Sequence, residues 1–318
     1  MKTEQIVTMP ILNPETGHPA KAHKFAGKLD LIENGVLSDW KTCTDPRKFL
    51  DQRTLSYQGE LYALAADVPI SEIQYRLIMR PTIKFCGKDK DEDGKPNRKM
   101  YEDRCLEWLL QKEGATLEHV HHINPARMKQ AREWLWSIHK RILHCEKHGY
   151  LTNEHGCNAW FKECPFLPLC LCDAQGGDVH DVIAERYQKK EHKHSELGKV
   201  DGDTITFSSA SCLALCEQKF QLQYKELLES KRQDDGDALF IGNVAHIGLE
   251  HFKATRSEAG GMAAIDEWEG KNIVLGADAN HAQDQNIAKA RAIVRAAALR
   301  WPSWDVAEGI TPKEELLF

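Results

Sequence analysis

The sequence predicts an α/β protein, because two kinds of pattern alternate along it. Residues 3–9, 25–42 and 73–80 show the apolar alternation of half-buried strands. Longer stretches are rich in helix-forming residues or carry apolar residues at helical spacing. These lie at 53–66, 101–111, 126–148, 238–254 and 282–300. Strands therefore dominate the first third of the chain and helices dominate the remainder.

Length and composition narrow the class of protein. A chain of 318 residues can bury a sizeable core in one large domain or two ordinary ones. No run approaches the roughly 18 consecutive apolar residues of a membrane span, and the N-terminus lacks the apolar segment of a secretory signal. We therefore expect a cytoplasmic protein with no membrane contact. The formal net charge of −6 excludes a global positive field that would attract nucleic acid, so DNA binding would need local basic surface and bound metal.

The most informative stretch is FAGKLDLIENGVLSDWKT, residues 25–42. Its Asn34-Gly35 pair lies between two alternating apolar runs, which favours a two-residue hairpin turn. Counting back from the turn gives the register. Glu33 pairs with Val36, Ile32 with Leu37, Leu31 with Ser38, and Asp30 with Asp39. The two aspartates are thus predicted to be neighbours across the hairpin.

Two interpretations of this hairpin follow from its residues. Like charges in directly opposed positions destabilise a hairpin, and a divalent cation between Asp30 and Asp39 would relieve that repulsion. The alternation of a strand places Lys41 on the same face. The opposite face carries Leu29, Leu31, Val36 and Trp40. Alternatively, the hairpin is simply amphipathic, and Lys28, Asp30, Asp39 and Lys41 form exposed ion pairs on its solvated face.

The segments after the hairpin are predicted in order. Residues 42–51 form a polar connection, and a helix over 53–66 places Gln58 and Tyr62 on one face. Residues 83–85 extend the strand at 73–80, and 87–99 form a charged loop that either is solvated or contacts DNA. The basic residues of the helix at 126–148 solvate its surface or bind phosphates.

The second half is predicted to be mainly helical. Residues 173–203 are a polar linker with a short helix over 178–190, after which Thr206, Ser208 and Ser209 are N-cap candidates for a new helix. The helix at 238–254 repeats Gly242, His246 and Glu250 at four-residue spacing. The last residues of the chain are predicted to enter a strand.

Together these motifs resemble the PD-(D/E)XK nuclease superfamily, in its RecB-like branch, which includes CRISPR-associated adaptation nucleases and phage exonucleases. Asp30, Asp39 and Lys41 look like the metal-binding core, residues 58–62 like the QxxxY helix, and residues 242–246 like the GxxxH helix. The resemblance implies a restriction-endonuclease-like core, with a mixed central sheet flanked by helices and with helical additions.

The order of the motifs differs from the order in that family. Placing residues 198–318 before 1–196 restores it, so the resemblance implies a circularly permuted domain. Residues 1–172 form one half, 173–203 the linker and 204–318 the half that completes the nuclease domain. Permutation is physically reasonable because domain termini usually lie close together on the surface. There are two alternatives. The two halves of the domain are completed between different chains, or the chain is an incomplete piece of a tandem arrangement.

The resemblance also implies a set of site residues. Asp30, Asp39, His246 and the backbone carbonyl of Trp40 would hold Mg²⁺ or Mn²⁺, the ions that hard oxygen ligands favour. Lys41 would orient or deprotonate a metal-bound water and stabilise developing charge. Gln58 and Tyr62 would position the DNA backbone or the lysine. A glutamate would complete the site, and Glu4, Glu315 and Glu250 are the candidates.

Ten cysteines in a reducing compartment favour metal or cluster ligation over disulfides. The resemblance assigns Cys157, Cys164, Cys170 and Cys216 to a [4Fe–4S] cluster. Six residues separate the first two, where the family usually has two, and Cys172 and Cys212 are the substitutes. Zn²⁺ and unligated thiols are the alternatives. The other cysteines are expected to be core or incidental: Cys43, Cys86, Cys105 and Cys145.

The function that the resemblance implies is metal-dependent DNA exonuclease activity without sequence specificity. Phage or bacterial recombination and repair is the expected setting, with a recombinase, helicase or integrase as a partner. The alternative is a catalytically silent DNA-binding or adaptor module stabilised by its cysteine-ligated cluster. The presence of Asp30, Asp39 and Lys41 together favours the enzyme.

Overall fold

A computed structural model describes residues 2–33, 35–158, 163–189, 203–231, 237–272 and 281–302. Its centre is a mixed sheet of strand order β1-β2-β3-β4-β5, with β7 paired to β2. The strands span Lys2–Leu12 (β1), Pro19–Glu33 (β2), Val36–Cys43 (β3), Glu72–Met79 (β4), Thr116–His122 (β5) and Asp203–Ile205 (β7). Strands β3 and β4 are parallel, as are β2 and β7, and the other neighbours are antiparallel. The predicted α/β class with a mixed, helix-flanked sheet is confirmed.

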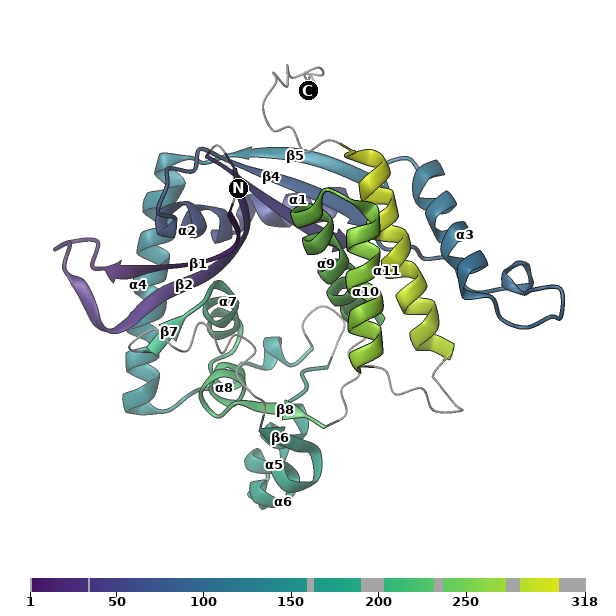
Figure 1. The fold of residues 1–318 in the computed structure, drawn as a ribbon. Helices are drawn as coiled ribbons and strands as arrows, with labels where there is room; N and C mark the ends of the chain where they lie inside the picture. The colour runs from purple at the N-terminus through teal and green to yellow at the C-terminus, as the bar shows by residue number, and fades with distance from the viewer. Residues whose placement is uncertain are drawn as a thin grey trace.

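Helices pack on both faces of the sheet (Figure 1). One face is covered by α3 (Arg98–Gln111), α9 (Asp237–Thr255), α10 (Glu258–Asn272) and α11 (His281–Arg300). The other face is covered by α1 (Pro46–Leu55), α2 (Gln58–Ala65), α4 (Pro125–His148) and α7 (Phe207–Leu215). The first of these layers joins helices from both halves of the sequence, since α3 packs against α11. The late helices thus share a core with the early strands.

A small lobe projects below this sandwich (Figure 1). It contains α5 (Leu167–Ala174), α6 (Val179–Arg186) and a two-stranded sheet of β6 (Tyr187–Lys189) and β8 (Leu228–Ser230), and it adjoins α8 (Glu217–Phe220). Its own apolar cluster includes Phe166, Tyr187 and Leu222. The segment 173–203, predicted as a linker, therefore contributes the end of α5, all of α6 and β6. Residues 190–202 lie outside the described residues.

Three sequence predictions need correction. The helix expected over 53–66 is two helices, because Ser56 takes an extended conformation and its hydroxyl accepts a hydrogen bond from the Gln58 amide. Residues 42–51 are not only a connection, since α1 begins at Pro46. Residues 83–85 form no strand. The carbonyl of Ile83 instead accepts a hydrogen bond from Tyr101 on α3.

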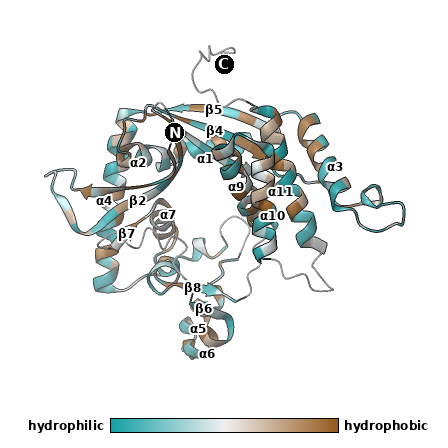
Figure 2. Ribbon diagram, in the orientation of Figure 1, coloured by the Kyte–Doolittle hydropathy of each residue, from teal (hydrophilic) through white to brown (hydrophobic). Residues whose placement is uncertain are grey.

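Other predictions agree with the structure. Thr206 caps α7 by accepting from the Ser209 amide, and α6 lies within the short helix expected at 178–190. The charged loop before α3 is hydrophilic in Figure 2 and is held by the ion pair between Asp89 and Arg104. The predicted strand entry at the end of the chain, with Glu315, lies outside the described residues, as do Asn34 and the side chain of Glu4.

Candidate active site

The hairpin of β2 and β3 positions the two aspartates. Its predicted register is confirmed for the three pairs nearest the turn, which end at Leu31 and Ser38. Gly35 has a φ of +79°, as the turn requires. One residue further on, the Trp40 backbone amide approaches the Asp30 carboxylate at 3.5 Å. The backbone of β3 therefore adjoins the Asp30 side chain, while the regular strand pairing ends at Leu31 and Ser38, one residue short of the predicted pair of Asp30 with Asp39.

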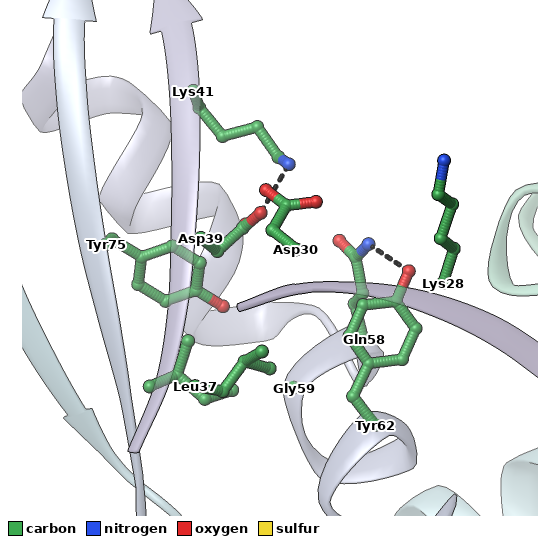
Figure 3. Close-up of a pocket in the computed structure, with 10 residues that line it drawn as sticks. Lys28, Asp30, Leu37, Asp39, Lys41, Gln58, Gly59, Tyr62 and Tyr75 are labelled. Carbon is green, nitrogen blue, oxygen red and sulfur yellow. Dashed lines mark hydrogen bonds and ion pairs between the residues drawn. The ribbon is translucent and has the colours of Figure 1, made fainter. Parts of the chain in front are cut away.

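The carboxylates of Asp30 and Asp39 face one another beneath the ammonium group of Lys41 (Figure 3). Lys41 Nζ lies 2.5 Å from Asp39 Oδ1. The side chains of Asp30 and Asp39 are only 17% and 13% exposed. This partial burial argues against the interpretation of the hairpin as a solvated face with exposed ion pairs. The two carboxylates repel one another where water screens them poorly.

The pKa values of the three groups reflect this crowding. Burial opposes the ionisation of Asp30, but Lys41 and Lys253 outweigh it and lower its pKa from 3.8 to about 2. Burial raises the pKa of Asp39, and the charge of Asp30 adds to the effect against the attraction of Lys41. Burial also opposes the charge of Lys41, but Asp39 and Asp30 outweigh it and raise its pKa. Lys41 is therefore a firmly charged ammonium group.

Helix α2 closes the pocket in front of the aspartates. The pocket is lined by Lys28, Asp30, Leu37, Asp39, Lys41, Gln58, Gly59, Tyr62, Ile73 and Tyr75. Gln58 Nε2 donates a 2.9 Å hydrogen bond to the Tyr62 hydroxyl, as their predicted common face allows (Figure 3). Arg53, at the end of α1, donates to Gln58 Oε1. The motif predicted from residues 58–62 thus borders the same pocket as the aspartates.

Helix α9 approaches the site from the other half of the chain. A Cβ on Gly242 would lie 3.1 Å from Thr42 Oγ1, so glycine lets the helix pass close to β3. One turn later, His246 Nε2 pairs with Glu250 Oε1 at 2.6 Å. His246 lies near enough to Asp30 to help lower its pKa. The helix thus brings His246 into the electrostatic neighbourhood of the carboxylates, with Glu250 as its direct partner.

One residue of this neighbourhood belongs to none of the sequence motifs. Lys253 of α9 is 2% exposed, and its Nζ lies 3.8 Å from Asp30 Oδ2. Burial lowers its pKa against the attraction of Asp30. A signal is present in the sequence, because Lys253 follows the apolar-stripe residue Leu249 by four positions and so shares the buried face of the helix. A lysine at the end of a helix is more often exposed, so this signal is weak.

The donor set at the aspartates fits a hard divalent cation. Two buried carboxylates that face one another supply oxygen ligands of the kind that Mg²⁺ and Mn²⁺ prefer. Trp40 follows Asp39, and its indole packs away from the pocket against Phe252 and Trp301. Across the described ranges, no three side chains of His, Cys, Asp or Glu are arranged to hold a metal ion. His246 is thus a neighbour of Asp30 but forms no such group with the two aspartates.

The four cysteines singled out in the sequence lie near one another beside the lobe, but within the described residues no three of them are arranged to hold a metal ion. The Cys164 amide donates a 2.6 Å hydrogen bond to the Cys157 carbonyl, and a Cβ on Gly156 would lie 3.2 Å from Cys216 Cβ. Burial raises the pKa of the Cys170 thiol to about 11, and the other three thiols add to the effect. The thiols are therefore close enough to interact electrostatically.

The two substitute cysteines lie elsewhere. Cys172 Sγ packs over Gly177 at the end of α5, and Cys212 Sγ lies 4.0 Å from Gln223 Oε1. Cys43, Cys105 and Cys145 are buried, and Cys86 is exposed. The structure thus distinguishes the four thiols from the other cysteines.

Comparisons with known protein families, with curated proteins and with solved structures find no match to this chain. Within the described residues, no helix has both the length and the apolar character needed to cross a membrane.

Proposed function

We propose that the protein is a metal-dependent deoxyribonuclease of the PD-(D/E)XK type, acting as an exonuclease on DNA. One observation carries the proposal. Asp30, Asp39 and Lys41 line the same pocket as Gln58 and Tyr62. If the charged face of the hairpin were simply solvated, there would be no reason for α2 to place Gln58 and Tyr62 around its carboxylates. The resemblance of the sequence motifs supplies the reaction class, and the buried pair of carboxylates supports it.

In this proposal Asp30 and Asp39 hold Mg²⁺ or Mn²⁺, assisted by the Trp40 carbonyl and with His246 nearby. When bound, the ion supplies Lewis-acid chemistry and lowers the pKa of a water ligand. Lys41 acts as a charged hydrogen-bond donor that stabilises negative charge on the phosphate, since its raised pKa keeps it protonated. The Gln58–Tyr62 pair orients the DNA backbone at the mouth of the pocket.

The proposal includes a circularly permuted order within one chain. Helix α9 packs against β3, and its Lys253 contacts Asp30. Both halves of the sequence therefore meet beside Asp30 without a second chain. This arrangement supports a single permuted nuclease domain over halves that complete one another between chains.

We further propose that Cys157, Cys164, Cys170 and Cys216 ligate a [4Fe–4S] cluster. Thiolates are the ligands that such clusters use, and the four thiols come from both sides of the segment 173–203. The cluster would tie α8 to the segment at 157–170. Zn²⁺ is the alternative ion that four thiolates bind. Measuring zinc, iron and sulfide in the same purified protein distinguishes the two.

Degradation of labelled linear DNA in the presence of Mg²⁺ or Mn²⁺ tests the enzymatic proposal. We expect the wild type to release nucleotides from the ends of linear DNA and to leave covalently closed circles intact. Lys41→Ala should reduce the rate at least about 100-fold, because it removes a charge-stabilising donor. The matched control is Lys271→Ala, which alters an exposed lysine of α10.

Two results would reject the proposal. One is the absence of degradation by the correctly folded wild type, and the other is undiminished degradation by Lys41→Ala. Binding of DNA without degradation would instead support the adaptor module.

A further inference from the structure

Lys253 is a buried lysine whose ammonium group has no hydrogen-bond partner among the described residues. Its side chain is 1% exposed, and its ammonium group lies 5.5 Å from the centre of the Trp40 ring. Burying an ammonium group without hydrogen bonds is costly, so a chain usually keeps lysine at the surface. Lys253 therefore needs an electrostatic explanation.

Asp30 is the nearest group that can supply one. The separation of 3.8 Å between Lys253 Nζ and Asp30 Oδ2 is longer than a hydrogen bond but within the range of an ion pair. In a buried site the attraction at this distance is several times stronger than in water. Lys253 thus lies on the α9 side of Asp30, whereas Lys41 lies on the side of Asp39.

Each carboxylate of the site has an ammonium partner. Asp39 pairs with Lys41 and Asp30 with Lys253, while Lys28 also lines the pocket and the charge of Arg53 acts on Asp39. One divalent cation would give the group an excess of positive charge, and a second would add to that excess where screening is weak. Without Lys253, Asp30 would lose the ammonium group on its α9 side.

We propose that Lys253 is a built-in counterion of Asp30 that limits the carboxylate pair to a single divalent metal ion and weakens the binding of that ion. The proposal rests on the proposed function, because it takes Asp30 and Asp39 as the metal-binding residues. It goes further by assigning a role to a residue of α9 that no motif includes. Lys253 acts through Asp30 and is therefore a positioning residue.

Binding of Mn²⁺ to the full chain tests the proposal directly. Isothermal titration and electron paramagnetic resonance count the ions bound and measure their dissociation constants, independently of DNA cleavage. A variant with Asp30→Asn and Asp39→Asn gives the background from other sites. We expect one ion per wild-type chain above this background. Lys253→Met should bind the first ion at least about tenfold more tightly or bind a second ion, because one opposing charge has been removed.

Two control variants separate charge from packing. Lys253→Arg keeps a cation beside Asp30 and should bind one ion, as the wild type does. Lys271→Met removes an exposed cation of α10 and should leave both the number of ions and the affinity unchanged. Circular dichroism establishes that each variant is folded, and the wild-type count tests the proposal even if Lys253→Met does not fold.

The outcomes distinguish this inference from the proposed function. Two ions on the wild type, or identical binding by the wild type and folded Lys253→Met, would overturn the inference while leaving the nuclease proposal intact. A wild type that binds one ion, responds to Lys253→Met and degrades no DNA would overturn the nuclease proposal alone. A wild type that binds no Mn²⁺ above background would overturn both.

Discussion

Gln58 donates a 2.9 Å hydrogen bond to the hydroxyl of Tyr62, one helical turn further along α2. Gly59 lies between them and faces β4. A Cβ at this position would lie 2.5 Å from Ile73 Cδ1 on β4. The close approach of α2 to the sheet, which brings Gln58 and Tyr62 to the pocket, therefore depends on the absence of a side chain at residue 59.

Gly59→Ala should destabilise the protein by up to about 2 kcal/mol, because the added methyl group meets Ile73 Cδ1 between α2 and β4 and this overpacking exceeds the gain in helix propensity. Chemical denaturation measures the change in the free energy of unfolding. The control is Gly270→Ala in α10, where a Cβ would meet no atom within 4 Å. Alanine there should be neutral or stabilise by up to about 1 kcal/mol. Equal stability of the two variants would contradict the role assigned to Gly59.

The buried ion pair of Glu60 and Arg127 gives a second prediction. Glu60 is fully buried, and its Oε1 accepts a 2.9 Å hydrogen bond from Arg127 Nε on α4. Arg127→Met should destabilise the protein by about 3 kcal/mol, because it leaves a buried carboxylate without its main cation. Thermal or urea unfolding measures this loss.

Lys129→Met is the control for this change, since Lys129 lies on the same helix with its side chain 81% exposed. It should cost less than about 1 kcal/mol. A further variant, Glu60→Gln combined with Arg127→Met, should be less destabilised than Arg127→Met alone, because the uncompensated charge is gone. A double variant that is more destabilised would argue that the guanidinium matters through packing alone.

The hairpin is predictable in detail because its turn is local. An Asn-Gly pair fixes the loop length, and a fixed loop length determines the register of the strands. The amino-acid pattern alone therefore indicates that Asp30 and Asp39 are neighbours. The same local logic correctly places Gln58 and Tyr62 on one face of a helix.

The errors have different physical causes. Strand β5, with the sequence TLEHVHH, is not predicted, because its three histidines and one glutamate interrupt any apolar alternation. It forms because β4 offers an edge with which it pairs over seven residues. The strand expected to continue through 83–85 ends before Pro81, which lacks the amide that a ladder needs.

The candidate site requires long-range information that no local pattern carries. The GxxxH resemblance brings His246 into consideration, but only the packing of α9 on β3 shows that Lys253 reaches Asp30. A resemblance transfers the residues of a motif. It cannot transfer a lysine outside that motif, whose burial depends on the whole tertiary structure.

Acid should remove the stabilisation that ionised Asp89 contributes in the loop before α3. Burial of Asp89 opposes its charge, but hydrogen bonds from Arg104 and the Cys86 amide outweigh burial and lower its pKa below the ordinary 3.8. A carboxylate with a lowered pKa in the folded state stabilises it above the unfolded pKa, and this contribution is lost as pH falls through the folded pKa. The free energy of unfolding should therefore fall below about pH 4.

Asp89→Asn isolates this contribution, because the amide cannot ionise. Its free energy of unfolding should be lower than that of the wild type at pH 7, and the difference should shrink as pH falls below about 4. Arg104→Met removes the guanidinium partner of Asp89. The difference in free energy of unfolding between the wild type and Arg104→Met should likewise shrink as pH falls below about 4. A constant difference between Asp89→Asn and the wild type across this range would show that Asp89 contributes through its shape and not its charge.

The last prediction concerns the cysteines and uses the distinction that the structure makes between neighbouring thiols. Cys170 and Cys172 lie on the same short helix, and the Cys170 thiol interacts electrostatically with Cys157, Cys164 and Cys216, whereas Cys172 Sγ packs over Gly177. Cys170→Ala should therefore abolish the visible absorbance and the iron and sulfide content of anaerobically purified protein. Cys172→Ala should retain them, because its thiol packs over Gly177.

Stability gives an independent readout of the same difference. A cluster that links the segment at 157–170 to Cys216 binds the folded state and not the unfolded chain, so its loss should lower the melting temperature. Cys170→Ala should melt several degrees below Cys172→Ala, because loss of the cluster removes that additional stabilisation. If the wild-type protein contains zinc and no iron or sulfide, the cofactor is a zinc ion and not a cluster, with the same four cysteines as ligands. Equal metal content in the two variants would refute ligation by Cys170 altogether.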